Sequence, residues 1–255
     1  MLISLVLANL KMIYRDKQAG TWAIAFPLIF LLIFSLFNFD DLEPMLHMQN
    51  QGIQGKPVDY FDFLMPGIIG MGVMTFSIIG MGTTIAQYRQ QRILRRIQAT
   101  PLKVRTFFIG QVLAWLILSL VQTAIIMTAG TIIFRAVIYG NYIWVIPLVV
   151  LANLTFLNLG FIVGSLSKSV QAASGLGNLL TMPMMFFSGV FFPTDNLPSI
   201  MAYAVKYLPL APLLETLRGV LLTAQPLSDF PTQLILLGGW VVATTAIAVK
   251  TFKFE

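Results

Sequence analysis

The chain has 255 residues, of which 57% are hydrophobic and 10% are charged. Soluble domains carry about a quarter charged residues, so this composition argues against a soluble enzyme and indicates lipid as the main solvent. The net charge of +6 does not indicate nucleic-acid binding, because most basic residues flank long apolar segments, as they do in cytoplasmic loops of membrane proteins. The sequence has no cysteine, which excludes disulfides, thiolate metal sites and thiol nucleophiles.

The first apolar stretch, residues 1–10, is short and is followed by Lys11, Arg15 and Lys17. A cleaved signal peptide has its basic residues before the apolar stretch instead. The pattern therefore predicts an interfacial helix that lies on the cytoplasmic leaflet. The alternative is an extension of the first membrane span.

The rest of the chain contains apolar segments of the length that a spanning helix needs, about 20 residues. Segments of this length must be helical, because unpaired backbone groups are not tolerated in hydrocarbon. The sequence predicts an all-α membrane protein, a single transmembrane domain over residues 1–255 without a nucleotide-binding domain. Its six predicted spans are residues 21–39, 65–88, 106–134, 142–165, 170–192 and 230–249.

The charged residues test this topology independently. With both termini placed in the cytoplasm, 12 of the 16 Lys and Arg residues fall on the cytoplasmic side, and eight of the ten acidic residues fall outside. This distribution obeys the positive-inside rule, which supports an even number of spans with cytoplasmic termini.

The segment after the second predicted span shows helical spacing of arginines beside an apolar pair, and a proline that ends the helix. It predicts a short amphipathic cytoplasmic helix. The helix binds either anionic lipid headgroups or a partner protein, and the apolar pair with the clean stop favours the partner. The residues concerned are Arg89, Arg92, Ile93, Arg96, Ile97 and Pro101.

The external segment 193–229 combines five prolines with apolar stretches too short to cross a bilayer. It predicts re-entrant helices that dip into the outer leaflet, and a flat surface helix is the alternative. Glu215 and Arg218 have the i, i+3 spacing of an ion pair on one helical face. The candidate external gate comprises Pro193, Leu197, Pro198, Pro209, Glu215 and Arg218.

No Asp, Glu, Lys or Arg lies within the predicted cores of the spans, which argues against ion-coupled transport and intramembrane proteolysis. Candidate substrate-facing residues are the methionines and phenylalanines that suit varied apolar ligands, Met74, Met182, Phe186 and Phe187. Gly70 and Gly80 are expected to make their helix flexible, and Gly160-x-x-x-Gly164 is a helix-packing motif. Most neutral polar residues are expected to link helices, and one or two to face the substrate path, among Asn38, Gln111, Gln122, Asn153, Asn158 and Asn178.

Three stretches resemble the type-2 permeases of ATP-binding-cassette (ABC) exporters. They are Ala99-Thr100-Pro101-Leu102, the run Phe187-Ser188-Gly189-Val190-Phe191-Phe192-Pro193 followed by Leu197-Pro198, and Pro209-Leu210 followed by Glu215 and Arg218. The sequence departs from the family at Gln87-Tyr88-Arg89-Gln90-Gln91, where the family carries acidic residues.

The resemblance implies a transport subunit and not an enzyme, in which residues 89–101 form the coupling helix to a cytoplasmic ABC ATPase. The chain lacks the phosphate-loop pattern, so ATP and Mg are expected on that partner, with no cofactor or metal on this chain. Six spans are half of what such exporters use, which implies a second permease copy, most simply a homodimer. The implied location is the plasma membrane of a prokaryote, the inner membrane in a Gram-negative cell.

The expected function is export of an amphipathic drug-like or lipid-like substrate, as in multidrug efflux. One alternative is a polysaccharide or lipid-linked glycan export permease. Another is a non-transporting membrane scaffold or immunity protein.

Overall fold

The computed structural model describes residues 2–15, 17–36, 60–93, 104–191 and 205–251. These residues form helices and short connections, without a β-strand among them. The α-helices are α1 (Leu2–Arg15), α2 (Lys17–Leu36), α4 (Tyr60–Gln90), α6 (Val104–Ile132), α7 (Val145–Leu166), α8 (Val170–Phe187), α10 (Leu210–Leu222) and α11 (Pro231–Thr251). Two short 3-10 helices, η3 (Tyr142–Trp144) and η5 (Leu227–Asp229), precede α7 and α11.

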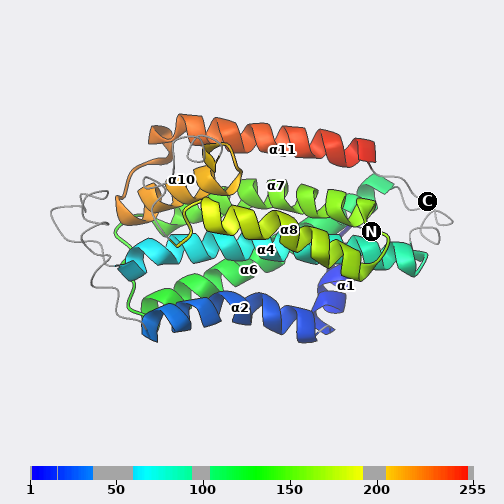
Figure 1. The fold of residues 1–255 in the computed structure, drawn as a ribbon, viewed down its shortest axis with the longest axis horizontal. Coiled ribbons are helices and arrows are strands. Elements are labelled where there is room, and N and C mark those ends of the chain that lie inside the picture. Colours follow the sequence, from blue (N-terminus) through cyan, green and yellow to red (C-terminus); the bar gives the residue numbers. More distant parts are fainter. Residues whose placement is uncertain (1, 16, 37–59, 94–103, 192–204, 252–255) are drawn as a thin grey trace.

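The long helices lie side by side along the long axis of the molecule (Figure 1). Helices α2, α6 and α8 run in one direction, and α4, α7 and α11 run in the other. As a result, α1 and the C-terminal end of α11 lie at the same end of the bundle (Figure 1), as the predicted even number of crossings requires.

Four helical segments are long and apolar enough to cross a membrane: Tyr60–Gln90, Thr106–Ile132, Tyr142–Leu166 and Pro231–Thr251. They agree with the second, third, fourth and sixth predicted spans. The described apolar part of α2, Ile24–Leu36, is shorter. Helix α8 has 18 residues, and polar residues such as Gln171 and Asn178 interrupt it. The first and fifth spans therefore stay predictions.

Helix α1 packs against α6 and crosses the end of the bundle at an angle to α2 (Figure 1). Val6 and Ile13 are buried by this packing, whereas Ile3 and Leu7 are exposed. The arrangement is not an extension of the first span. The depth of α1 at the membrane surface stays a prediction.

The centre of the bundle is α4, which contacts α2, α6, α7, α8 and α10. Its closest neighbour is α7, where Gly160 and Gly164 lie against the α4 backbone. A β-carbon on Gly160 would lie 2.7 Å from the carbonyl oxygens of Ser77 and Ile78, and one on Gly164 would lie 2.5 Å from the oxygen of Gly82. The packing role predicted for the Gly160-x-x-x-Gly164 motif is confirmed.

Helix α4 begins at Tyr60, five residues before the predicted start of the second span. Residues 60–64 are therefore helical as well, and this described span contains an acid, Asp62. Asp62 is buried in the first turn, and its Oδ1 accepts a hydrogen bond from the backbone nitrogen of Val137 at 2.7 Å. A carboxylate is favoured there because the helix N-terminus carries partial positive charge.

Replacing Asp62 by alanine is expected to lower the free energy of unfolding by about 1–3 kcal/mol, because the part-buried hydrogen bond from the Val137 N–H to a charged acceptor is lost. Asp62→Asn keeps an acceptor oxygen and should lose less. Unfolding in detergent, followed by circular dichroism, measures both. Asp229→Ala at an exposed site in η5 is the control, and an equal effect of Asp62→Ala and this control would refute the role assigned to Asp62.

Candidate functional site

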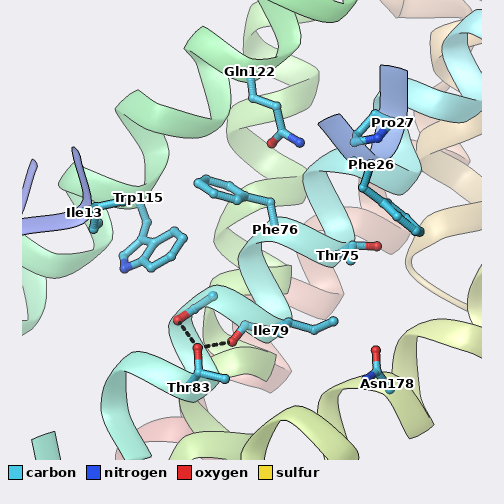
Figure 2. Close-up of a pocket in the computed structure, with 12 residues that line it drawn as sticks. Ile13, Phe26, Pro27, Thr75, Phe76, Ile79, Thr83, Trp115, Gln122 and Asn178 are labelled. Carbon is cyan, nitrogen blue, oxygen red and sulfur yellow. Dashed lines mark hydrogen bonds between the residues drawn. The ribbon is translucent and has the colours of Figure 1, made fainter. Parts of the chain in front are cut away.

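A cavity of about 550 Å³ lies between α1, α2, α4, α6 and α8 (Figure 2). Its size is in the range of small-molecule sites, about 300–1,000 Å³. The described lining residues are Ile13, Phe26, Pro27, Gly72, Thr75, Phe76, Ile79, Gly80, Thr83, Trp115, Gln122 and Asn178.

Helix α4 supplies one continuous wall of this cavity. Its lining residues recur every three or four positions from Gly72 to Thr83, which places them on one helical face. Gly80 is needed at this wall because the Trp115 ring from α6 occupies the space of a β-carbon there. The Phe76 and Trp115 rings meet with their centroids 4.8 Å apart (Figure 2).

Neutral polar groups complete the lining. Gln122 extends from α6, Asn178 extends from α8, and Thr75 and Thr83 lie on α4 (Figure 2). The Thr83 hydroxyl donates to the Ile79 carbonyl at 2.8 Å. None of the described lining residues is ionisable. The cavity is thus mainly aromatic and aliphatic, with separate hydrogen-bonding groups on three helices.

Two other neutral polar residues link helices, as expected. Asn153 on α7 accepts from the Ser77 hydroxyl at 2.8 Å. Asn158 donates from its side-chain nitrogen to the Thr245 hydroxyl on α11 at 2.8 Å. The expectation that such residues join helices holds for Asn153 and Asn158, and the expectation that one or two face a substrate path stays a prediction.

The residues predicted to face substrate are not brought together in this cavity. Met74 is fully buried in the main apolar core, whereas Met182, Phe186 and Phe187 are exposed on α8. Gly70 on α4 lies against the Leu214 side chain. The substrate-facing roles, and the flexibility expected from Gly70 and Gly80, stay predictions.

The segment predicted to couple to an ATPase begins at the C-terminal end of α4. Two of its residues, Arg89 and Ile93, make contacts within the helical bundle. The Arg89 side chain lies in the last turn of α4 and donates to the backbone oxygen of Ser165 on α7. Ile93 packs on the cluster that contains Tyr88 and Phe107. Helix α4 continues through Gln90, so the predicted amphipathic helix does not begin at Arg89.

Arg92 is exposed, and its φ of 55° places it in the left-handed region where the chain turns after α4. Among the described basic residues predicted to contact the ATPase, Arg92 is the exposed one. Arg96, Ile97 and Pro101 lie outside the described residues.

At the opposite end of the bundle, Arg218 on α10 contacts the chain that follows α8. Its Nη2 donates to the carbonyl oxygens of Gly189 at 2.6 Å and Val190 at 3.3 Å. Its guanidinium carbon lies 3.7 Å from the centre of the Phe63 ring on α4. Arg218 therefore joins three elements that are distant in sequence.

The same contact explains why α8 ends at Phe187, before the predicted end of the fifth span. Gly189 has a φ of 82°, the left-handed conformation that glycine adopts after a helix C-terminus. The Tyr60 hydroxyl donates to the Phe191 carbonyl oxygen at 3.1 Å, so α4 also holds this turn.

The expected ion pair between Glu215 and Arg218 is not what the structure shows. Glu215 is exposed, while the Arg218 guanidinium points to backbone carbonyls and an aromatic ring. Burial lowers the pKa of Arg218 to about 9, which leaves it protonated at neutral pH. Of the other candidate gate residues, Pro209 is buried and precedes α10, and Pro193, Leu197 and Pro198 lie outside the described residues.

Comparison with known proteins shows that the sequence pattern of the family described as ABC-2 type transporter matches residues 2–222. Nodulation protein J of Rhizobium meliloti is 30% identical over 168 residues, which are 65% of this chain and 63% of that protein, or less than two thirds of its length. The putative transport permease YvfS of Bacillus subtilis is 23% identical over 205 residues, 80% of this chain and 78% of that protein. The probable multidrug ABC transporter permease YbhR of Escherichia coli is 26% identical over 141 residues, 55% of this chain and 38% of that protein. With its long apolar helices, the chain is a multi-pass membrane protein that belongs to the ABC-2 type transporter family.

Proposed function

We propose that the chain is the permease subunit of an ATP-driven ABC exporter that carries an amphipathic drug-like or lipid-like substrate out of the cell. The observation that carries this proposal is the family match over residues 2–222. The sequence given has no phosphate-loop pattern, and we expect ATP and Mg on a separate ATPase subunit.

A second permease copy belongs to this proposal. Six predicted spans are half of the number that such exporters use, and Leu179, Met182 and Phe186 form an exposed apolar face on α8. A homodimer that covers α8 buries this face.

The mainly apolar lining of the cavity supports an amphipathic substrate over the alternative of glycan export, because a long polar glycan would need many more hydrogen-bonding groups along its path. A non-transporting scaffold would not need a cavity of this size between its membrane helices.

Export is tested in cells that express the chain together with its ABC ATPase and are loaded with a neutral fluorescent amphiphile such as prodan. The proposal expects faster, ATP-dependent loss of the dye than in cells with either chain alone. An ATPase variant that binds but does not hydrolyse ATP should remove the effect. Equal loss with and without hydrolysis would contradict the proposed function.

Contact with the ATPase is tested at Arg92, since Arg89 and Ile93 are engaged within the fold. Arg92→Glu is expected to reduce recovery of the ATPase with the tagged permease about five- to tenfold, because a charge reversal at an interface opposes association. Lys250→Glu is the matched control, an exposed cation near the end of α11 at the same end of the bundle (Figure 1). Similar recovery with the two variants would place the ATPase contact away from Arg92.

A further inference from the structure

Two side-chain amides line the cavity from different helices, Gln122 on α6 and Asn178 on α8 (Figure 2). A side-chain amide both donates and accepts hydrogen bonds. The cavity can therefore bind the polar group of a ligand.

The remaining lining sets the chemistry of that ligand. Aromatic rings from three helices, those of Phe26, Phe76 and Trp115, surround the cavity and favour stacked or edge contacts with a ligand ring (Figure 2). The described lining has no ionisable group, so a charged ligand would lose its hydration without gaining an opposite charge. An uncharged ligand avoids this cost.

We propose that the cavity is a binding site, contained within one protomer, for an uncharged aromatic amphiphile. The ligand's rings contact Phe26, Phe76 and Trp115. Gln122 and Asn178 offer polar contacts from opposite sides. This proposal rests on the proposed function, because it identifies the bound ligand with the class of substrate that is exported. Binding itself needs neither the ATPase nor ATP.

The test measures binding of prodan, a neutral naphthalene ketone, to the purified full-length chain in lipid nanodiscs, with empty nanodiscs as background. Saturable binding at one site per chain is expected. The toluidinyl-naphthalene sulfonate TNS has the same naphthalene core with a second aromatic ring and an anionic sulfonate. Because of this charge, its Kd is expected to be at least about tenfold higher.

Adjacent threonines on α4 supply a matched pair of variants. Thr83 lines the cavity, and Thr84 is not among its lining residues although both side chains are half-buried. Thr83→Phe should fill the cavity and raise the Kd for prodan about tenfold or more, whereas Thr84→Phe should leave the Kd within about twofold. If Thr83→Phe does not fold, Thr75→Phe at the same wall replaces it.

The site is refuted if Thr83→Phe and Thr84→Phe behave alike, or if TNS binds as tightly as prodan. Binding without ATP-dependent export would leave the site standing and refute the proposed function instead.

Discussion

Replacing Arg218 by methionine is expected to lower the free energy of unfolding by about 3–5 kcal/mol, because it removes charged hydrogen bonds and a desolvated cation–π contact together. The lost partners are the Gly189 and Val190 carbonyl oxygens and the Phe63 ring. Methionine fills much of the volume but leaves these carbonyl groups without their donor. Denaturant or thermal unfolding in detergent, followed by circular dichroism, measures the change.

Two further variants separate the contact from simple charge. Arg218→Lys keeps the charge but not the planar group of donors, so it is expected to recover less than half of the lost stability. Glu215→Gln should change stability by less than about 0.5 kcal/mol because Glu215 is exposed. A loss from Glu215→Gln as large as that from Arg218→Met would show that the two residues form an ion pair after all.

Replacing Gly164 by alanine is the second change with a large expected effect. The new β-carbon would lie 2.5 Å from the Gly82 carbonyl oxygen and 2.7 Å from the Ile85 Cβ atom, so α4 and α7 would have to separate. Overpacking of this kind costs about 1–3 kcal/mol. Gly160→Ala should lower the free energy of unfolding by a similar amount, because its β-carbon would face two carbonyl oxygens of α4.

Gly175 on α8 provides the control for both glycine variants, because nothing lies within 4 Å of the position that its β-carbon would take. Gly175→Ala is expected to be neutral or to stabilise by about 0.5–1 kcal/mol through helix propensity. Fluorescence-detected size-exclusion chromatography after heating ranks the three variants. The same loss in all three would contradict the packing role of the α4–α7 contact.

The apolar lengths of the sequence predicted four of the long helices well, since hydrophobic length and backbone pairing are local properties. The start of α4 was predicted too late, because a charged residue such as Asp62 is more typical of a loop than of a membrane helix. Asp62 accepts a hydrogen bond from Val137, which is 75 positions away in the sequence. A local sequence pattern cannot predict a partner at that distance.

The candidate site was harder to predict for the same reason. The spacing of Glu215 and Arg218 suggested an ion pair, but contacts from α4 and from the turn after α8 decide where Arg218 points. Gln122 and Asn178 were recognised as candidates by being polar in apolar helices. The aromatic wall of Phe26, Phe76 and Trp115 comes from α2, α4 and α6, and only their packing in space brings it together.

The composition of the native complex tests the proposed role of the chain as a permease subunit. The tagged chain, extracted from membranes of its own source in mild detergent, is analysed by native mass spectrometry with and without ATP. We expect an assembly of permease copies with an ABC ATPase in equal numbers, in which nucleotide is bound only by the ATPase. A chain recovered without any ABC ATPase, while its fold and membrane insertion are intact, would contradict the claim that it is the permease subunit of an ATP-driven exporter.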